Sequence, residues 1–272
     1  MKRHLLFLFL GLSSSQILPA QDSAAFRSPY NSVNWGTDGL TFGTGIAVAF
    51  IASAIDDTMP VLTLNEISAL DKNSINAIDR ISAGNYSHTQ SKISDVLVGA
   101  SILSPALLML DPAIRKDAGT ISTMYLETVL FATFTPSLGK GSAKRIRPYV
   151  YSTSAPLSLK QDDDSRRSFF SGHSTWAFAT SVFFASVYTD YHPDSEYKKY
   201  IWGGAFGLAS TVAILRVTSG AHFISDVVVG AAVGSAIGYG IPYLHRTISE
   251  DVTVSPVLGP DYRGIHLSLH LK

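Results

Sequence analysis

Residues 216–226, which read RVTSGAHFISD, combine an arginine, a histidine and an aspartate at short spacing. An apolar run follows, so His222 and Asp226 are predicted to lie in the first turns of a helix, four residues apart on one face. The aspartate can then hold one imidazole nitrogen and leave the other facing a substrate. Arg216, just before the turn, supplies a planar cation that suits phosphate oxygens. The competing interpretation is structural, because a histidine with a capping aspartate is common at helix starts.

A second segment, residues 139–150, is basic and reads GKGSAKRIRPYV. Lys140 and Arg147 are seven residues apart, which is two helical turns, and they point the same way if the segment is helical. Lys144 shares that face, Arg145 does not, and Pro148 ends any helix. A solvated basic loop or a charge cluster flanking a membrane is the competing interpretation.

A third segment, residues 168–175, reads SFFSGHST and opens an apolar stretch. Ser171, Gly172 and His173 are therefore predicted to begin a helix, whose exposed N–H groups and positive dipole end form a ready anion site. His173 could give a proton to a leaving oxygen there. An ordinary serine cap beside a histidine explains the same residues.

Taken together, the three segments resemble the signature of the type 2 phosphatidic acid phosphatase (PAP2) superfamily, K-x6-RP, PSGH and SR-x5-H-x3-D. That superfamily shares its core with bacterial class A acid phosphatases and vanadium haloperoxidases. Phe170 stands where the family has proline and Leu215 where it has serine, and neither change removes a charged or proton-transferring group. The resemblance covers about residues 95–245.

The resemblance implies a phosphomonoesterase that needs no metal or other cofactor and forms a phosphohistidine intermediate. In that scheme His222 is the nucleophile, Asp226 orients it, and His173 is the general acid to the leaving alcohol. The resemblance also implies a phosphate cradle made by Lys140, Arg147, Arg216, Ser171 and the Gly172 N–H. Phosphoryl transfer mainly needs positioning and neutralisation of the equatorial oxygens, so three cations can take the place of a metal ion.

Six apolar segments predict the elements that must position these residues, and they favour an all-α six-helix bundle of the PAP2/haloperoxidase type. The segments are residues 40–55, 96–110, 121–138, 175–188, 201–217 and 227–244. Residues 64–83 are predicted to be an amphipathic helix lying against something apolar. We expect the glycines at four-residue spacing in the last two segments to let helices approach closely: Gly203, Gly207, Gly230, Gly234 and Gly238.

The ends of the chain differ from this helical region. Residues 1–20 have a basic head, a short apolar core and a small final residue, Ala20, which predicts a cleaved secretory signal and export to the bacterial cell envelope. A polar lead-in covers residues 21–39, and the helical phosphatase domain covers residues 40–247 with its motif-bearing core at 95–245. The alternating residues 248–272 predict a short C-terminal β-hairpin.

Composition excludes several classes of function. The formal net charge is zero, which argues against nucleic acid as a partner. Cysteine is absent, so disulfides, thiol catalysis and thiolate metal sites are excluded. Asp162, Asp163 and Asp164 could suggest a metal site, but without matching ligands a solvated acidic loop is the favoured interpretation, and no metal site is predicted.

Membrane association is expected, but its form stays open. Each apolar segment has about 15 to 18 residues, below the roughly 20 that span a bilayer comfortably. If the signal is cleaved and all six helices cross, residues 139–174 and 218–225 fall on the cytoplasmic side. A membrane-associated bundle with a periplasm-facing site is the favoured interpretation, and a soluble periplasmic domain is the alternative.

Four functions are compatible with the sequence. A lipid phosphatase acting on phosphatidate, a polyprenyl pyrophosphate or the phosphate of lipid A leads, because the helices around the site are apolar. A soluble periplasmic acid phosphatase acting on small phosphate esters is the alternative. A vanadium-dependent haloperoxidase is the third possibility, and a non-catalytic envelope scaffold is the fourth.

Overall fold

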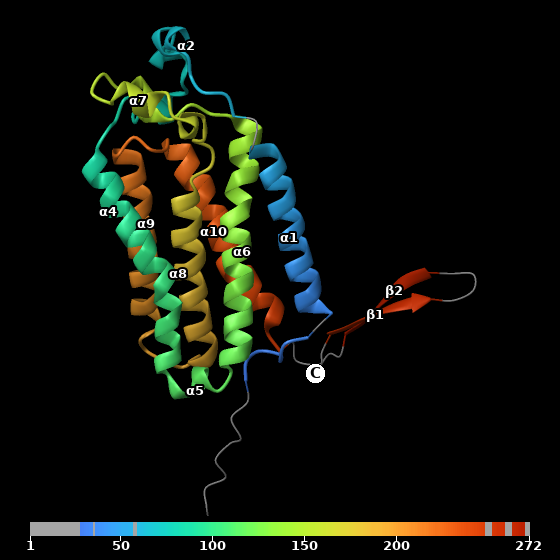
Figure 1. Ribbon diagram of the computed structural model, residues 1–272. Helices are drawn as coiled ribbons and strands as arrows, with labels where there is room; N and C mark the ends of the chain where they lie inside the picture. The colour runs from blue at the N-terminus through green and yellow to red at the C-terminus, as the bar shows by residue number, and fades with distance from the viewer. Residues whose placement is uncertain (1–27, 35, 57–58, 248–251, 259–262, 270–272) are drawn as a thin grey trace, which may run out of the picture.

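The computed structural model describes residues 28–34, 36–56, 59–247, 252–258 and 263–269. The predicted signal peptide and its cleavage site after Ala20 lie outside these residues. Within them the chain is predominantly helical, which confirms the helical part of the predicted fold class. The long helices run side by side, up and down along one axis (Figure 1).

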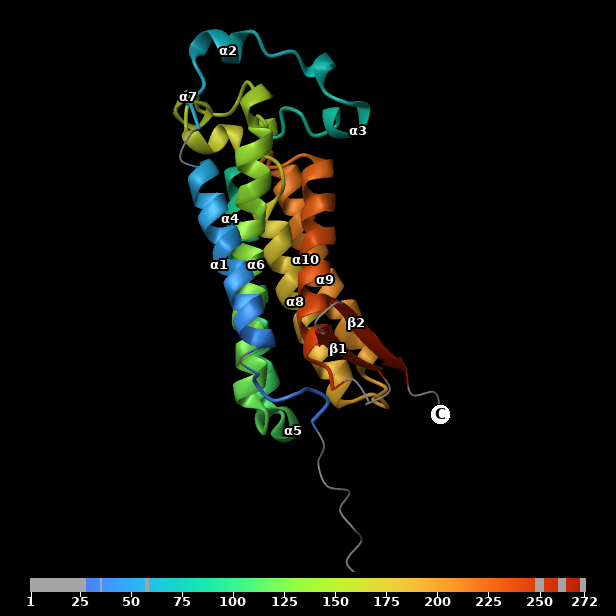
Figure 2. The ribbon, with the colours of Figure 1, turned by 90° about the vertical axis from the view of Figure 1, so that its right-hand side faces the viewer.

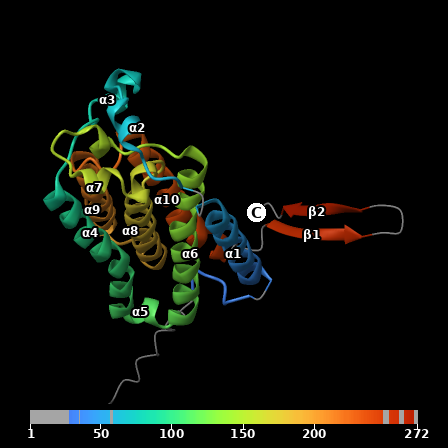
Figure 3. The same cartoon turned by 45° about the horizontal axis from the view of Figure 1, so that its top comes forward.

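In the described part of the chain, six helices contain 16 or more residues. They are α1 (Thr37–Asp56), α4 (His88–Leu103), α6 (Ala118–Ala143), α8 (Gly172–Tyr191), α9 (Lys198–Thr218) and α10 (Ile224–His245). Helix α8 contacts α4, α6, α9 and α10, while α1 packs on α6 (Figure 3). The core of the bundle therefore lies around α8, whose first turn carries the predicted anion site.

Short helices fill the connections: α2 (Leu64–Ser68), η1 (Lys72–Ser74), α3 (Ala77–Arg80), η2 (Ser104–Leu110), α5 (Pro112–Arg115), η3 (Pro148–Tyr151), α7 (Leu157–Lys160) and η4 (Asp163–Arg166). The expected single amphipathic helix over residues 64–83 is wrong, because α2, η1 and α3 replace it. The side chains of Thr63, Asp71 and Asn76 each cap a new short helix and so interrupt the long one.

Two antiparallel strands follow the bundle. Strand β1 (Val252–Leu258) pairs with β2 (Arg263–Leu269), and the register runs from Val252 opposite Leu269 to Leu258 opposite Arg263. These strands fall within the predicted hairpin, whose connecting residues 259–262 lie outside the described part of the chain.

Helices α8 and α10 approach each other so closely that their backbones are in contact. A methyl group at Gly230 would lie 2.6 Å from the carbonyl oxygen of Ser171, and methyl groups at Gly234 and Gly238 would overlap the carbonyl oxygens of α8. The expectation of close helix approach is therefore confirmed for α10. It is wrong for Gly203 and Gly207 on α9, where an added methyl group would meet nothing within 4 Å among the described residues.

Replacing Gly234 with alanine is expected to lower the free energy of unfolding by about 1–3 kcal/mol, because the added methyl group forces the α8 and α10 backbones apart. Gly203→Ala is the matched control and is expected to be neutral or slightly stabilising, because its site is open. Chemical denaturation of both variants in detergent checks this. Equal losses in the two variants would contradict the role of close packing.

The outer faces of the bundle are apolar. Among the described residues, four helices are long and apolar enough to cross a membrane, over Thr37–Ile55, His88–Leu110, Lys198–Thr218 and Ile224–His245. Only 17% of the apolar stretch of α1 is buried, and Phe50 in that helix is 81% exposed. These exposed faces support association with a membrane. The sequence pattern underestimates their length because each helix begins three to eight residues before the apolar segment predicted for it.

The two ends of the bundle differ in what they carry. Tyr30 and Arg246 pair through a β-bridge at one end, where the Asn31 N–H also donates to the His245 carbonyl oxygen at 2.8 Å. The connections that carry the sequence motifs lie at the other end, covered by α2, α3 and α7 (Figure 2). The described chain thus enters and leaves the bundle at the end opposite the motifs.

Candidate active site

The three sequence segments meet where several helices begin or end. Lys140 lies near the end of α6, Gly172 and His173 begin α8, and Arg216 lies near the end of α9. His222 lies in the turn between α9 and α10. The positive charges of Arg147, Arg216 and Lys140 all act on the His222 ring, so the fold gathers the predicted cations around that histidine.

The buried His222 ring is held by the backbone. Its Nδ1 atom lies 2.7 Å from the carbonyl oxygen of Ser168, and only 1% of the residue is exposed. A carbonyl oxygen only accepts hydrogen bonds, so Nδ1 must carry the proton. In the neutral ring the lone pair is then on Nε2. The arrangement leaves a lone pair on Nε2 that can act as a nucleophile or as a base.

The charge state of His222 agrees with that tautomer. Burial lowers the pKa of its imidazole well below the usual value near 6.5, and the positive charges of Arg147 and Arg216 lower it further. The ring is therefore neutral at pH 7, as nucleophilic attack requires.

Asp226 acts less directly than the sequence predicts. Its Oδ2 atom lies 3.9 Å from His222 Nδ1, which is beyond hydrogen-bond distance. The same oxygen accepts from the Ser168 hydroxyl at 2.6 Å and from the Phe223 N–H at 2.8 Å. The carboxylate therefore holds the backbone on both sides of the ring, and the carbonyl of Ser168 orients the ring itself. Ser168 is a site residue that the sequence reasoning missed.

Arg145 is a second residue that the sequence reasoning set aside. Helix α6 ends at Ala143, and Lys144 adopts a left-handed conformation with φ of 44°, so the segment is not helical through Pro148. The turn directs Arg145 onto Asp226, where its Nη1 atom donates to Oδ1 at 2.5 Å. Its Nη2 atom donates to Asp79 Oδ2 at 2.7 Å.

Asp79 on α3 completes a buried cluster with Arg145 and Asp226. It is fully buried and accepts from the Ser225 N–H at 2.8 Å and the Ser225 hydroxyl at 2.6 Å. Burial alone would raise the pKa of the Asp79 carboxyl, but the Arg145 and Ser225 hydrogen bonds outweigh it and lower the pKa to about 2. The cluster joins the short helices that cover the site to the first turn of α10.

Replacing Arg145 with alanine is expected to lower kcat about 10- to 100-fold, because Asp226 loses its cation and the backbone around His222 loosens. Substrate KM should change little, since Arg145 is bound to carboxylates. Arg145→Lys should restore part of kcat, and Arg115→Ala, in the short helix α5, is the control. A larger change in KM than in kcat would contradict the positioning role.

Arg147 and Arg216 are both buried and are fixed by different partners. Arg147 donates to the Asp164 carboxylate at 2.7 Å and to the Ala221 carbonyl oxygen at 3.2 Å. Two members of the acidic loop therefore lie in ion pairs, Asp164 with Arg147 and Asp163 with Arg167. Arg216 donates to the hydroxyl groups of Ser91 and Ser94 at 3.2 Å, and its buried Nε atom has no hydrogen-bond partner among the described residues. That atom can donate to an anion.

The start of α8 adds donors of its own. Ser171 is the N-cap, and its hydroxyl oxygen accepts from the Ser174 N–H at 3.3 Å. Ser171 is therefore a helix cap, as the competing interpretation of the sequence predicts. Its O–H can still donate a hydrogen bond to a phosphate oxygen. A methyl group added at Gly172 would lie 3.8 Å from Lys140 Nζ, so this cation lies beside the helix start.

His173 has a carboxylate partner that the sequence reasoning missed. Its Nε2 atom lies 2.9 Å from Asp95 Oδ1, and Arg216 Nη1 lies 3.4 Å from the same oxygen. Burial and the Arg216 charge lower the pKa of His173 to about 4, against the opposing effect of Asp95. Asp95 is the one acidic residue in the sequence of α4. A lone carboxylate in an apolar helix often has a functional role, so this feature of the sequence could have identified Asp95 as a candidate site residue.

Comparison with known proteins was made on the sequence and on the fold. A model of the PAP2 superfamily matches residues 122–250, which include all three motif segments. The fold is similar to the crystal structure of the first transmembrane PAP2 type phosphatidylglycerolphosphate phosphatase from Bacillus subtilis, with 21% sequence identity and a TM-score of 0.43. The match covers 76% of this chain and 94% of that one. No curated protein sequence matches the chain.

Proposed function

The chain belongs to the PAP2 superfamily, and from this premise we propose that it hydrolyses the phosphate ester of a lipid through a phosphohistidine. One observation carries the proposal. The Ser168 carbonyl oxygen fixes the His222 proton on Nδ1, and this leaves the Nε2 lone pair of a buried, neutral ring among cationic side chains. Cations that neutralise phosphoryl oxygens next to a neutral imidazole suit phosphoryl transfer.

The proposed reaction has two steps. In the first, His222 Nε2 attacks phosphorus, the bond from phosphorus to the ester oxygen breaks, and His173 gives its proton to the leaving alkoxide. In the second, water attacks the phosphohistidine, its proton passes to His173, and the bond from phosphorus to nitrogen breaks to release inorganic phosphate. Lys140, Arg147 and Arg216 balance the charge of the phosphoryl oxygens throughout.

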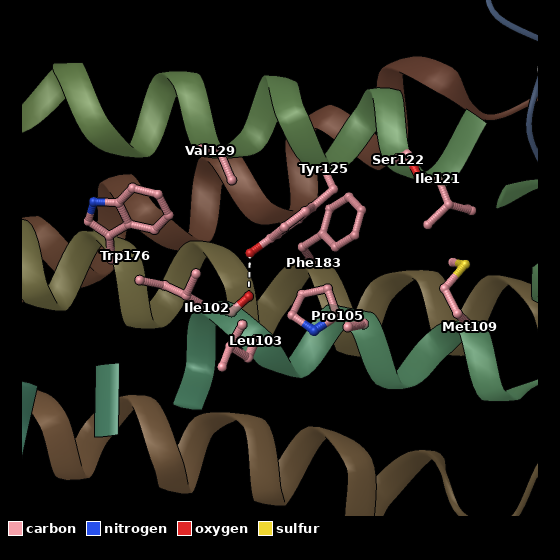
Figure 4. Close-up of a pocket in the computed structure, with 11 residues that line it drawn as sticks. Ile102, Leu103, Pro105, Met109, Ile121, Ser122, Tyr125, Val129, Trp176 and Phe183 are labelled. Atoms are coloured by element: carbon pink, nitrogen blue, oxygen red, sulfur yellow. Dashed lines mark hydrogen bonds between the residues drawn. The ribbon is translucent and has the colours of Figure 1, made fainter. Parts of the chain in front are cut away.

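A pocket between α4, η2, α6 and α8 supports a lipid as the substrate. It has a volume of about 370 Å³ and is lined almost entirely by apolar side chains. Trp176 lies at one end and Met109 toward the other (Figure 4). Trp176 follows His173 by three residues on α8, so the pocket begins about one helical turn from the proposed general acid. We propose that the pocket takes one hydrocarbon chain of the substrate.

Filling this pocket is expected to impair the hydrolysis of lipid substrates and to leave the hydrolysis of soluble substrates unchanged. Ala106→Trp places an indole in the pocket, so KM for a long-chain phosphatidate should rise at least about 10-fold, a loss typical of excluding several methylenes. Hydrolysis of a soluble aryl phosphate should be unchanged. Ile51→Trp, on the exposed face of α1, is the control. An equal loss on both substrates would contradict the assignment of the pocket.

The function itself is tested by phosphate release in the presence of EDTA. The substrates are an aryl phosphate, phosphatidate, a polyprenyl pyrophosphate and lipid A. Release from one lipid alone would support the proposal and name the substrate. Release mainly from the aryl phosphate would favour the periplasmic acid phosphatase, and halide oxidation with added vanadate in place of hydrolysis would favour the haloperoxidase.

A further inference from the structure

Three ionisable side chains meet at the end of the bundle that is far from His222. Asp38 comes from α1, Glu127 from α6 and His245 from the end of α10. His245 Nε2 lies 2.8 Å from Glu127 Oε2, and its Nδ1 lies 3.5 Å from Asp38 Oδ1. One donor atom from each of the three residues lies within 4.8 Å of the others. Three helices thus converge on one cluster.

The cluster is buried and its negative charge is not balanced. Asp38, Glu127 and His245 are 4%, 0% and 7% exposed. Among the described residues, no lysine or arginine forms an ion pair with either carboxylate. Even a protonated imidazole would supply one positive charge against two carboxylates. Buried carboxylates without a cation are costly, so the cluster calls for a further positive charge.

Two oxygen atoms in the cluster also have no hydrogen-bond partner in the described part of the chain. They are Oδ1 of Asp38 and Oε1 of Glu127, both fully buried. The 3.5 Å separation between His245 Nδ1 and Asp38 Oδ1 is within ion-pair range but too long for a good hydrogen bond. Buried acceptors of this kind are rare, and a bound cation is one way to satisfy them.

We propose that Asp38, Glu127 and His245 bind a divalent transition-metal ion of the Zn²⁺ type. One imidazole nitrogen and two carboxylate oxygens form a typical ligand set for such an ion, with water as the fourth ligand. At bond lengths of about 2.0–2.2 Å, tetrahedral ligands lie roughly 3.3 Å apart. The donor atoms lie within 4.8 Å of one another, so side-chain rotations that bring them closer by up to about 1.5 Å would close them on the ion.

A polar pocket gives the ion access to the cluster, and the distance of the cluster from the candidate active site indicates a structural role. A pocket of about 540 Å³ with mostly polar walls borders His245 and is lined by Asn31, Asn34 and Thr37. It lets hydrated ions reach the cluster. The length of α10 separates His245 from the first turn that carries Asp226, about 30 Å at 1.5 Å per residue. The ion therefore fastens α1 to α6 and α10 and takes no part in phosphoryl transfer.

Metal content of the purified full chain tests the site directly. After incubation with Zn²⁺ and removal of free ion, elemental analysis is expected to find about one Zn²⁺ per chain. Glu127→Gln and His245→Ala should lose it. His192→Ala should retain it, because His192 pairs with Asp111 at 2.7 Å in a partly exposed pair and neither residue belongs to the cluster. His222→Ala should retain it as well.

Thermal unfolding of the wild-type chain gives a second reading that needs no variant. Zn²⁺ at 100 times its dissociation constant should raise Tm by about 5–10 °C over the EDTA-treated protein. Less than a tenth of an equivalent of metal and an unchanged Tm with Zn²⁺, Mn²⁺ and Fe²⁺ would overturn the proposal and leave the His245 ring as a direct partner of the two carboxylates. Phosphate release in EDTA is a separate measurement, so failure of this site and failure of the proposed enzyme activity are distinguishable.

Discussion

His222→Ala is expected to abolish phosphate release from every substrate, with a loss of about 10⁴-fold or more in kcat. The reason is that His222 offers a buried, neutral nitrogen among the cations of the site, and its proton is held on Nδ1 by the Ser168 carbonyl oxygen. Removing a nucleophile leaves only the activity due to binding and charge stabilisation, so a small residual rate is the most that should remain. Initial rates of phosphate release by wild type and variant, in detergent, give the result.

Two controls accompany this variant. His192→Ala removes a histidine of the opposite end and should leave the rate unchanged. Trapping with labelled substrate and rapid quenching should give a base-stable, acid-labile phosphoprotein in the wild type and none in His222→Ala. Full activity of His222→Ala, or labelling at another residue, would show that the proposed nucleophile is wrong.

His173→Ala is expected to lower kcat by about 10²–10⁴-fold on alkyl phosphates, the range typical of a lost general acid. Its effect should depend on the leaving group. An alkoxide needs a proton, whereas nitrophenolate leaves without one, so the variant should be far less impaired on nitrophenyl phosphate. An equal loss on both esters would contradict the role of His173 as proton donor.

The pH dependence of kcat/KM is expected to follow the protonation of His173. His173 gives a proton only when it is charged, and its pKa of about 4 means that the charged form of the free enzyme is lost as the pH rises above 4. The value of kcat/KM should therefore fall with rising pH on that side of the profile. Asp95 raises the pKa of His173, so Asp95→Asn should move this limb to lower pH. A shift to higher pH would contradict the contact.

The motif residues could be found from sequence because their spacing is local. Arg216, His222 and Asp226 occupy one turn and its flanks, and Ser171 to His173 form one helix start. Such patterns depend on covalent neighbours. The apolar segments likewise predict the long helices, since apolar length is a property of the segment itself.

The partners of the motif residues could not be found in this way. Arg145 and Asp79 are separated by 66 residues, and His173 and Asp95 by 78. These contacts exist only because the helices pack as they do, so no spacing rule contains them. Arg145 is not predicted as a site residue because a helix continuing past Ala143 would direct its side chain away from the site. The structure differs because α6 ends at Ala143.

The placement of Tyr30 and Arg246 at the end opposite the motifs decides which lipids the enzyme can reach. In a bundle that crosses the bilayer, the leaflet that supplies the substrate is the one remote from both residues. Cleavage after Ala20 during export would put Tyr30 on the periplasmic side and open the site to the cytoplasmic leaflet. Retention of Tyr30 on the cytoplasmic side would open the site to the periplasmic leaflet, where phosphate would be released into the periplasm. The orientation of one terminus in the membrane therefore sets the pool of lipid that the enzyme processes.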